Sequence, residues 1–368
     1  MSQVFISAAH KSSGKTLVST GLCAAYRRRG MRVAAFKKGP DYIDPAWLTK
    51  ASGNSCWNLD FFTMNQEEIL TCFKAQRQGA DVTVVEGNKG LFDGLDVEGS
   101  DSNAALAVTL GLPVLLVIDV TGITRGIAPL LAGYTEFDPE VRIAGVILNR
   151  VAGPRQESKL RAAIERYSDL PVLGAIGRDP RLAIEERHLG LVPGNEDPEA
   201  FARIEKIADV IEATVDLDAV LALTGRRQDS EPVAVSAAAT RAAEKGRPVR
   251  IGIARDRAFG FYYPDELDAC ANAGAELVPF NTLEDERLPQ VDGLFIGGGF
   301  PECFLEELSA NVSLREDIRM FIENGGPGYA ECGGLMYLSR SIAWQGSEFP
   351  MVGVIAGDTK VSNRPVGR

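Results

Sequence analysis

The sequence lacks the features that mark several large classes of protein. Its longest apolar runs, such as Val114–Ile118, are no longer than a strand, so no segment is expected to span a membrane. The first residues show no basic stretch followed by an apolar stretch, and without such a signal peptide we expect a cytoplasmic protein. Acidic residues outnumber basic ones by 50 to 39, and the resulting net charge of −11 argues against a nucleic-acid-binding protein.

Cysteine and histidine are also scarce. The six cysteines include no CxxC pair, which argues against a disulfide framework, and a cysteine taken by itself is expected to be a small buried hydrophobe. Only two histidines are present, His10 and His188, and this limits the choice of base for any catalytic thiol.

The apolar pattern predicts two α/β domains in series, because a chain of 368 residues exceeds the roughly 250–300 residues that one core usually supports. Over residues 1–225, near-continuous apolar runs alternate with helical stretches, which is typical of a parallel sheet covered by helices on both faces. Strands are expected at Val4–Ala8, Val33–Phe36, Val82–Glu86, Val114–Asp119, Ile143–Asn149 and Val172–Ile176. Helices are expected at Thr16–Arg29, Gln66–Gln78, Ser102–Leu110, Ile123–Ala132 and Gln156–Tyr167.

A polar, alanine-rich and proline-flanked segment, residues 226–248, interrupts this pattern and is predicted to be a linker. The alternation begins again at residue 249 and continues toward residue 368, which predicts the second domain. Its strands are expected at Val249–Ala254, Leu277–Pro279, Leu294–Ile296 and Tyr329–Glu331.

A phosphate-binding loop is predicted between the first strand and the first helix. The segment Ala8–Thr16 ends in Gly-Lys-Thr, and in this position the backbone N–H groups at the helix start hold phosphate oxygens. Lys15 would reach the outer phosphates, and the Thr16 hydroxyl would bind Mg²⁺. The strict pattern has glycine in place of Ala9, and serines replace its other glycines, so an ordinary strand-to-helix turn is the alternative.

Carboxylates follow two other strands of the same domain. Glu86 ends one predicted strand, and Asp41 and Asp44 follow another. Ligands of an open α/β sheet gather outside the carboxyl ends of its strands, so we expect these acids near the phosphate loop, where Mg²⁺ would need them. Asn149, at the end of a further strand, is a weaker candidate for reading a nucleotide base. A turn at Asp44 and a helix cap at Glu86 are the structural alternatives.

A nucleophile elbow is predicted in the second domain. The segment Pro327–Leu335 places Cys332 between a short strand and a helix, with two glycines directly after it. The start of a helix lowers the pKa of a thiol and offers N–H groups to an oxyanion. Upstream, the three glycines within Ile296–Glu302 would let the backbone approach a tetrahedral intermediate closely. A buried structural thiol is the alternative, and it describes Cys23 and Cys72 better than Cys332.

Taken together, these motifs resemble those of the cobyrinate a,c-diamide synthase family. The resemblance covers the whole chain and is carried by the phosphate loop, Gly-Pro-Asp-Tyr-Ile-Asp-Pro, Glu-Gly-x-x-Gly-Leu-Phe-Asp-Gly, Arg-His-Leu-Gly-Leu-Val-Pro, Gly-Gly-Gly-Phe-Pro-Glu and Ala-Glu-Cys-Gly-Gly-Leu-Met-Tyr-Leu. It implies a glutamine-dependent amidoligase. A domain similar to dethiobiotin synthetase would activate side-chain carboxylates of a corrin-type tetrapyrrole with ATP and Mg²⁺. A class I glutamine amidotransferase domain would release ammonia from glutamine.

The resemblance also implies roles for individual residues. The nucleotide is assigned to Ser12, Ser13, Gly14, Lys15 and Thr16, beside the candidate Asn149, and Mg²⁺ is assigned to Thr16, Asp44 and Glu86. The substrate is assigned to Lys37, Asp41, Tyr42, Asp93 and His188. In the second domain Cys332 would form the glutamyl thioester, with the oxyanion and the glutamine bordered by Gly298, Gly299, Phe300 and Gly333. The oligomeric state stays open, with a homodimer as one option.

Two departures from the family pattern bear on the activity. The sequence stops at residues 363–368, before the family's Gly-His-Glu-Phe-His segment, so we expect this chain by itself to hydrolyse glutamine poorly, with truncation favoured over strands supplied from elsewhere. Ammonia would still feed the synthetase domain directly. The phosphate loop, Ala-His-Lys-Ser-Ser-Gly-Lys-Thr, is similar to that of relatives that amidate sirohaem. Corrin, sirohaem and nickel sirohydrochlorin therefore all stay open as substrates.

Two non-catalytic interpretations remain beside the ligase. A P-loop nucleotide switch would control a partner protein through its ATP state, but such a switch has no need of a nucleophile elbow at Cys332. A degenerate protein that binds a tetrapyrrole without turnover is compatible with the missing histidine. Phosphate release that depends on a tetrapyrrole substrate distinguishes the ligase from both.

Overall fold

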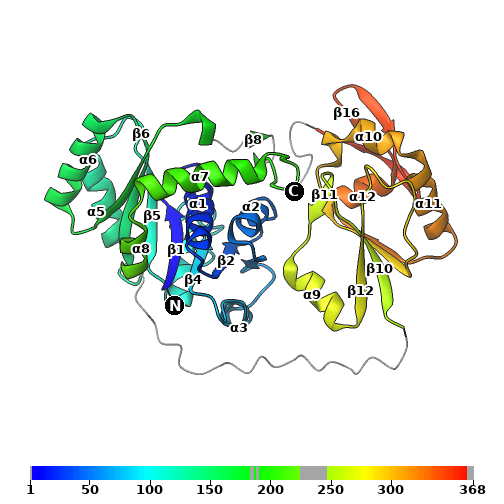
Figure 1. Cartoon of the computed structure of the whole chain (residues 1–368), viewed down its shortest axis with the longest axis horizontal. Coiled ribbons are helices and arrows are strands. Elements are labelled where there is room, and N and C mark those ends of the chain that lie inside the picture. The colour runs from blue at the N-terminus through cyan, green and yellow to red at the C-terminus, as the bar shows by residue number, and fades with distance from the viewer. Residues whose placement is uncertain (1, 183–185, 188–189, 224–246, 363–368) are drawn as a thin grey trace. The chain divides into compact units, whose positions relative to one another are not determined.

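The chain folds into two α/β units, as the sequence predicts (Figure 1). A computed structural model describes residues 2–182, 186–187, 190–223 and 247–362. One compact unit consists of Met1–Arg187 with Leu191–Val235, and the other of Ser236–Arg368 with His188–Gly190. The predicted linker lies outside the described residues except for residues 247 and 248, and the substrate candidate His188 lies outside them too.

A parallel sheet of seven strands forms the centre of the first unit. The strand order is β3-β2-β4-β1-β5-β6-β7, and every neighbouring pair is parallel. The strands are β1 (Ser2–Ala8), β2 (Val33–Lys38), β3 (Cys56–Leu59), β4 (Val82–Glu86), β5 (Val114–Asp119), β6 (Ile143–Val151) and β7 (Val172–Gly177), and a separate short pair is formed by β8 (Glu186–Arg187) and β9 (Gly190–Leu191). Because β2, β4 and β1 are neighbours, the loops after these three strands emerge side by side at the carboxyl edge of the sheet.

Helices cover both faces of this sheet. They are α1 (Lys15–Arg28), α2 (Ile43–Ser52), α3 (Gln66–Gln76), α4 (Asn103–Leu110), α5 (Ile127–Phe137), α6 (Pro154–Tyr167), α7 (Ala200–Thr214) and α8 (Leu217–Leu223), with a 3-10 turn at Pro180–Leu182. Apolar side chains of α1, α2, α7 and α8 share one buried cluster, and those of α3, α4, α5 and α6 share another. The strands are apolar on both sides because each side packs against helices. No helix in the described part of the chain is both long enough and apolar enough to cross a membrane.

The predicted strands and helices of the first unit are all present, but the sequence analysis does not predict β3, α2, α7 or α8. The largest difference in bounds is at α5, which begins at Ile127 rather than Ile123 and ends at Phe137 rather than Ala132. The side-chain amide of Gln156 donates to the carbonyl oxygens of Val120 and Ile123, at 2.7 and 2.8 Å. These two carbonyls are therefore held in a turn by a long-range contact that local sequence does not reveal.

The second unit contains a smaller parallel sheet with the strand order β12-β10-β13-β15. These four strands, all predicted, are β10 (Val249–Ala254), β12 (Ala275–Phe280), β13 (Gly293–Ile296) and β15 (Gly328–Ala330). The helix expected directly after Cys332 is present as α12 (Gly333–Leu338). The remaining elements are not predicted individually. They are the pair β11 (Phe259–Phe261) and β14 (Gly298–Gly299), the sheet β17-β16-β18 made of β16 (Ser339–Trp344), β17 (Ser347–Pro350) and β18 (Ile355–Lys360), the helices α9 (Pro264–Asn272), α10 (Leu305–Ala310) and α11 (Val312–Glu323), and a 3-10 turn at Pro301–Cys303.

Candidate functional site

The phosphate loop between β1 and α1 is held in a conformation that requires glycine. Ser12 and Gly14 both have positive φ, 62° and 99°. A Cβ on Gly14 would lie 2.1 Å from Asn149 Nδ2, and this same amide nitrogen donates to the Ser13 carbonyl at 2.8 Å. Ser13 Oγ in turn donates to the His10 carbonyl at 2.8 Å. Asn149, a candidate for reading a base, is thus placed to hold the loop itself.

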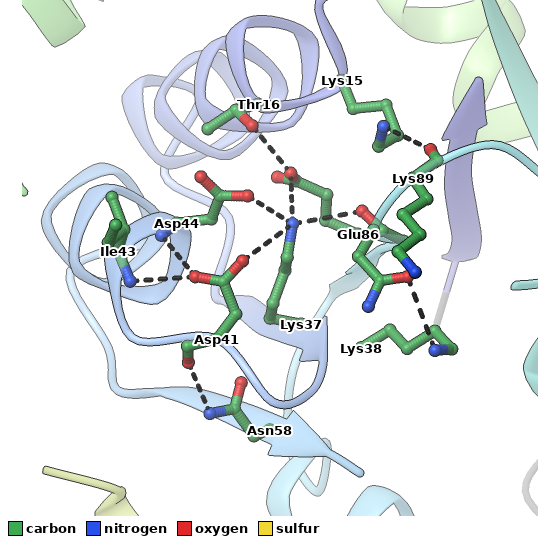
Figure 2. A network of polar contacts seen from close by, with 12 residues as sticks. Lys15, Thr16, Lys37, Lys38, Asp41, Ile43, Asp44, Asn58, Glu86 and Lys89 are labelled. Carbon is green, nitrogen blue, oxygen red and sulfur yellow. Dashed lines mark hydrogen bonds and ion pairs between the residues drawn. The ribbon is translucent and has the colours of Figure 1, made fainter. Parts of the chain in front are cut away.

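The ammonium group of Lys37 is the centre of a buried charge cluster (Figure 2). Its Nζ donates to a carboxylate oxygen of Asp44, to Glu86 Oε1 at 2.8 Å and to the Gly87 carbonyl at 3.1 Å, and Asp41 Oδ2 lies 3.7 Å away. The side chains of Lys37 and Glu86 are 1% and 0% exposed. One ammonium group therefore connects the three carboxylates that follow β2 and β4.

The pKa values in this cluster follow from the pairing. Burial opposes the charge on Lys37, but the carboxylates of Asp44, Glu86 and Asp41 together raise its pKa well above the usual value. Burial raises the pKa of Asp41 to about 7, and the neighbouring Asp44 carboxylate adds to this shift. Burial also raises the pKa of Glu86. At Asp44 burial is outweighed by Lys37, so that its pKa is lowered. The cluster thus favours the ionised form of Asp44 and leaves Asp41 titrating near neutral pH.

Lys15 and Thr16, at the start of α1, face the same cluster. Thr16 Oγ1 donates to Glu86 Oε1 at 2.9 Å, and Lys15 Nζ donates to the Lys89 carbonyl at 2.6 Å. Lys15 is buried, and the burial lowers its pKa to about 8. The structure therefore brings together Lys15, Thr16, Asp44 and Glu86, as Figure 2 shows.

The short loop after β4, residues 87–90, carries carbonyl oxygen atoms that accept hydrogen bonds from Lys15 and Lys37. Asn103, fully buried at the start of α4, holds the loop: its Nδ2 donates to the carbonyls of Asn88 and Gly90, and its Oδ1 accepts the Asn88 N–H at 3.0 Å. Asp93 Oδ2 accepts the Gly90 N–H at 3.0 Å. Asp93, predicted to border the substrate, therefore also stabilises this loop.

The oxygen atoms gathered here fit Mg²⁺. Glu86 Oε2 is buried and has no hydrogen-bond partner among the described residues, so it is available to a cation. Mg²⁺ prefers one or two carboxylates together with hydroxyl, water or phosphate oxygens, which is the chemistry of Thr16, Asp44 and Glu86. Among the described residues, no three His, Cys, Asp or Glu side chains form a metal site by themselves. The ion would therefore depend on phosphate oxygens for the rest of its ligands.

Asp41 and Tyr42 lie at the start of α2, beside the cluster. Asp41 Oδ1 accepts the N–H groups of Ile43 and Asp44 at 2.9 and 3.0 Å, which stabilises the first turn of this helix. Tyr42 immediately precedes the helix and is half-buried. A helix that begins with such a cap explains why the segment is not the simple turn considered as the alternative at Asp44. Of the predicted substrate residues, Lys37 thus lies in β2, and Asp41 and Tyr42 follow that strand.

Cys332 in the second unit occupies a strained turn between β15 and α12. Its φ is 48° and its ψ is −116°, a conformation that costs a non-glycine residue about 1–3 kcal/mol. The side chain is exposed. Strain of this kind persists only where the surrounding structure enforces it, and it is found disproportionately at functional sites. The geometry matches the predicted elbow.

Glycines enforce this turn. A Cβ on Gly334 would lie 2.1 Å from the Ile296 carbonyl oxygen, and one on Gly333 would lie 2.8 Å from the Gly299 carbonyl oxygen. A Cβ on Gly299 would lie 1.9 Å from another backbone carbonyl, that of Ala258. Any side chain at these positions would clash with backbone carbonyl groups, and only glycine fits.

The predicted oxyanion residues lie next to the thiol. A Cβ on Gly298 would be in van der Waals contact with Cys332 Cβ, 3.5 Å away. Phe300 is buried, and its ring packs edge-on against that of Phe261, with centroids 5.2 Å apart. No histidine is among the described residues of the second unit. The structure thus shows a thiol on an elbow without a described imidazole base.

Two positioning residues are absent from the sequence analysis. Asn103 has no motif of its own, although a buried asparagine directly after the helix-capping Ser102 is a weak signal. The Tyr262 hydroxyl accepts the Gly297 N–H at 3.0 Å and donates to the Ala254 carbonyl at 2.6 Å. It therefore fixes the strand end from which the glycine-rich segment beside the thiol departs.

Comparisons with known proteins agree with this division of the chain. Residues 5–192 match the CobQ/CobB/MinD/ParA nucleotide binding domain, and residues 250–368 match the CobB/CobQ-like glutamine amidotransferase domain. The chain is 50% identical to a cobyrinate a,c-diamide synthase of Magnetococcus marinus, with 99% of this chain and 79% of the relative covered. Proteins of the same name from Listeria innocua and Methanosarcina acetivorans are 42% and 44% identical, covering 99% and 93% of this chain and 80% and 71% of the relatives.

Proposed function

Because this chain belongs to the cobyrinate a,c-diamide synthase family, we propose that it uses ATP and Mg²⁺ to convert side-chain carboxylates of a tetrapyrrole into amides. The family and its two domains make the chain a carbon–nitrogen ligase with glutamine as nitrogen donor. The observation that carries the proposal is the convergence of Lys15, Thr16, Asp44 and Glu86 at the carboxyl edge of one sheet. A nucleotide switch needs the first two groups, but it has no use for a second unit with a strained thiol.

The residues of the first unit would activate the substrate carboxylate as follows. The N–H groups at the start of α1 and the ammonium of Lys15 bind the triphosphate. Mg²⁺, held by Thr16, Asp44 and Glu86, would offset negative charge on the transferring phosphate. Lys37 holds the carboxylates of Asp44 and Glu86 in place by donating a hydrogen bond to each.

The proposed chemistry proceeds through an acyl phosphate. A substrate carboxylate oxygen attacks the γ-phosphorus of ATP, and ADP leaves. Ammonia then attacks the carbonyl carbon, the bond to the phosphate oxygen breaks, and the proton lost by the nitrogen leaves with the phosphate as hydrogen phosphate. Activation is needed because a carboxylate is a poor electrophile, and Lys15 stabilises charge on the phosphate oxygens during transfer.

In the second unit Cys332 would release ammonia from glutamine. The Cys332 sulfur attacks the carboxamide carbon, the proton of the thiol is transferred to the leaving nitrogen, and ammonia departs. Water then hydrolyses the resulting thioester to glutamate and restores the thiol. Gly298, Gly299 and Gly333 supply backbone near the thiol, where an oxyanion would form. Free ammonia would replace this half-reaction whenever the thiol lacks an effective base.

A second tetrapyrrole is favoured by one feature of the sequence. The phosphate loop Ala-His-Lys-Ser-Ser-Gly-Lys-Thr is similar to that of sirohaem-amidating relatives, so sirohaem and nickel sirohydrochlorin are the competing substrates.

The test measures phosphate release with ATP, Mg²⁺ and ammonium chloride in the presence of each of these tetrapyrroles, with mass spectrometry of the products. We expect phosphate release that depends on one tetrapyrrole, together with the mass change of carboxylate-to-amide conversion. A Lys15→Ala variant provides the inactive control. Absence of substrate-dependent phosphate release with every tetrapyrrole would leave the nucleotide switch or the non-catalytic binder.

A further inference from the structure

Lys38 is a second buried lysine beside the charge cluster, and it faces away from that cluster. Neighbouring side chains of a strand point to opposite faces, and Figure 2 shows Lys37 directed toward the carboxylates and Lys38 directed away from them. Lys38 Nζ donates to Asn88 Oδ1 instead. Lys38 is 4% exposed. The Nζ atoms of the two lysines contact consecutive residues of the loop after β4, namely Gly87 and Asn88.

The Lys38 ammonium is poorly satisfied. Its one hydrogen bond in the described part of the chain is long, 3.4 Å to Asn88 Oδ1, and it forms no ion pair there. Burial lowers its pKa, and the carboxylates of Asp101 and Asp60 oppose this shift from a greater distance. Buried ammonium groups are normally paired, because burying a charge without a partner is costly. Two of its three N–H groups therefore have no acceptor among the described residues and are available to an anion.

One aromatic side chain, that of Phe61, lies next to this ammonium. The ring of Phe61 lies under Lys38 Nζ, 5.9 Å from the ring centroid, and the next residue, Phe62, is 87% exposed. Leu95 is 82% exposed, and its backbone N–H donates to the same Asp101 whose charge acts on Lys38. A buried cation next to an aromatic ring suits a ligand with an apolar face and carboxylates at its edge.

We propose that Lys38 binds a second carboxylate of the tetrapyrrole, one that is not being activated, and so determines which carboxylate reaches the phosphate site. The inference rests on the proposed function and names a specificity residue for it. Because Lys15 and Lys38 contact adjacent residues of one loop, Lys89 and Asn88, the anchored carboxylate would lie close to the one being activated. A phosphate group of the nucleotide is the competing anion, and it would be expected on the Lys15 side of β2 instead.

Binding measurements test this without turnover. The full chain is titrated with cobyrinate and with its fully esterified, uncharged derivative, and binding is followed by visible absorbance. Loss of one charge-assisted hydrogen bond should make Lys38→Met bind cobyrinate about 10- to 100-fold more weakly, with binding of the ester unchanged. Lys38→Arg should restore most of the affinity, and Lys159→Met, which removes an exposed lysine of α6, should have no effect.

Each outcome decides the inference. Equal affinity of wild type and Lys38→Met for cobyrinate would overturn it, as would a lack of binding to the wild type. Equal weakening for acid and ester would show a structural role, and weaker binding of ADP would assign the ammonium to the nucleotide. The proposed function fails separately, when the wild type binds cobyrinate through Lys38 but releases no phosphate in its presence.

Discussion

The two units build their reactive groups by opposite means. In the first unit, charged side chains are buried and paired with one another around Lys37, and the backbone supplies mostly acceptors. In the second unit, the reactive thiol of Cys332 is exposed, and the turn that carries it is enforced by glycines pressed against backbone carbonyls. Removing a charge should therefore damage the first site, whereas adding a methyl group should damage the second.

The largest effect is expected from removing the central charge of the first unit. Lys37→Met leaves the buried carboxylates of Asp44 and Glu86 uncompensated, and breaking a buried ion pair this way costs about 3–5 kcal/mol. We expect a marked fall in the thermal midpoint of unfolding, measured by circular dichroism, together with loss of ATP turnover. Adding Glu86→Gln to this variant should restore part of the stability. An unchanged midpoint would show that the cluster is not held by Lys37.

The matching change in the second unit adds a methyl group. Gly334→Ala places a Cβ 2.1 Å from the Ile296 carbonyl oxygen and should destabilise the elbow by about 1–3 kcal/mol. Any glutamine-driven amidation should disappear, while ammonium-driven amidation continues. Gly357→Ala in β18 is the control, since a Cβ there meets nothing within 4 Å. Retained glutamine use in Gly334→Ala would mean that the turn is more adaptable than its contacts indicate.

A smaller effect is expected from pH at Lys15. Its pKa is lowered to about 8, so the ammonium is charged below this pH and largely neutral above it. Phosphate binding needs the charged form, and above pH 8 the protein must take up a proton to bind ADP with magnesium. The dissociation constant should therefore rise with pH, by at most tenfold per pH unit. Calorimetry between pH 7 and 9 measures this, and Lys15→Arg, which stays charged, should show a flat profile.

The smallest effect on stability is expected from Cys332→Ser. The thiol is exposed and the glycines that shape its turn are untouched, so the free energy of unfolding should change by about 0.5 kcal/mol or less. Any glutamine-driven amidation should be lost, and the ammonium-driven rate should stay the same. A fall in the ammonium-driven rate would show that the two reactive groups are not chemically independent.

The parts of this molecule that follow local rules could be predicted from the sequence. Continuous apolar runs identify the buried strands, and the phosphate loop and the cysteine elbow each consist of adjacent residues. What remained hidden depends on distant partners. Lys37 contacts Glu86 across neighbouring strands, and Gln156 holds the turn before α5, so neither role is encoded by its own neighbours in the sequence.

Strand β3 and helix α2 show the same limit. β3 (Cys56–Leu59) is a short edge strand whose pairing partner is β2, and four residues carry little periodicity. Helix α2 begins at a carboxylate cap from Asp41 that is also part of the charge cluster. Asp41 both caps this helix and contacts Lys37, and the sequence around it shows neither role clearly. The capping role of Asp41 is therefore not predicted.

The side-chain amide of Asn103 influences the positions of several charged groups at once. It fixes the loop whose oxygen atoms accept hydrogen bonds from Lys15, Lys37 and Lys38. All three ammonium groups are therefore hydrogen-bonded to one loop before any anion binds. At Lys15, ligand entry then becomes an exchange of one oxygen partner for another, whereas Lys38 keeps N–H groups for an added anion. A change at Asn103 would accordingly behave like a simultaneous alteration of three lysines, and its effects would not add to those of any one of them.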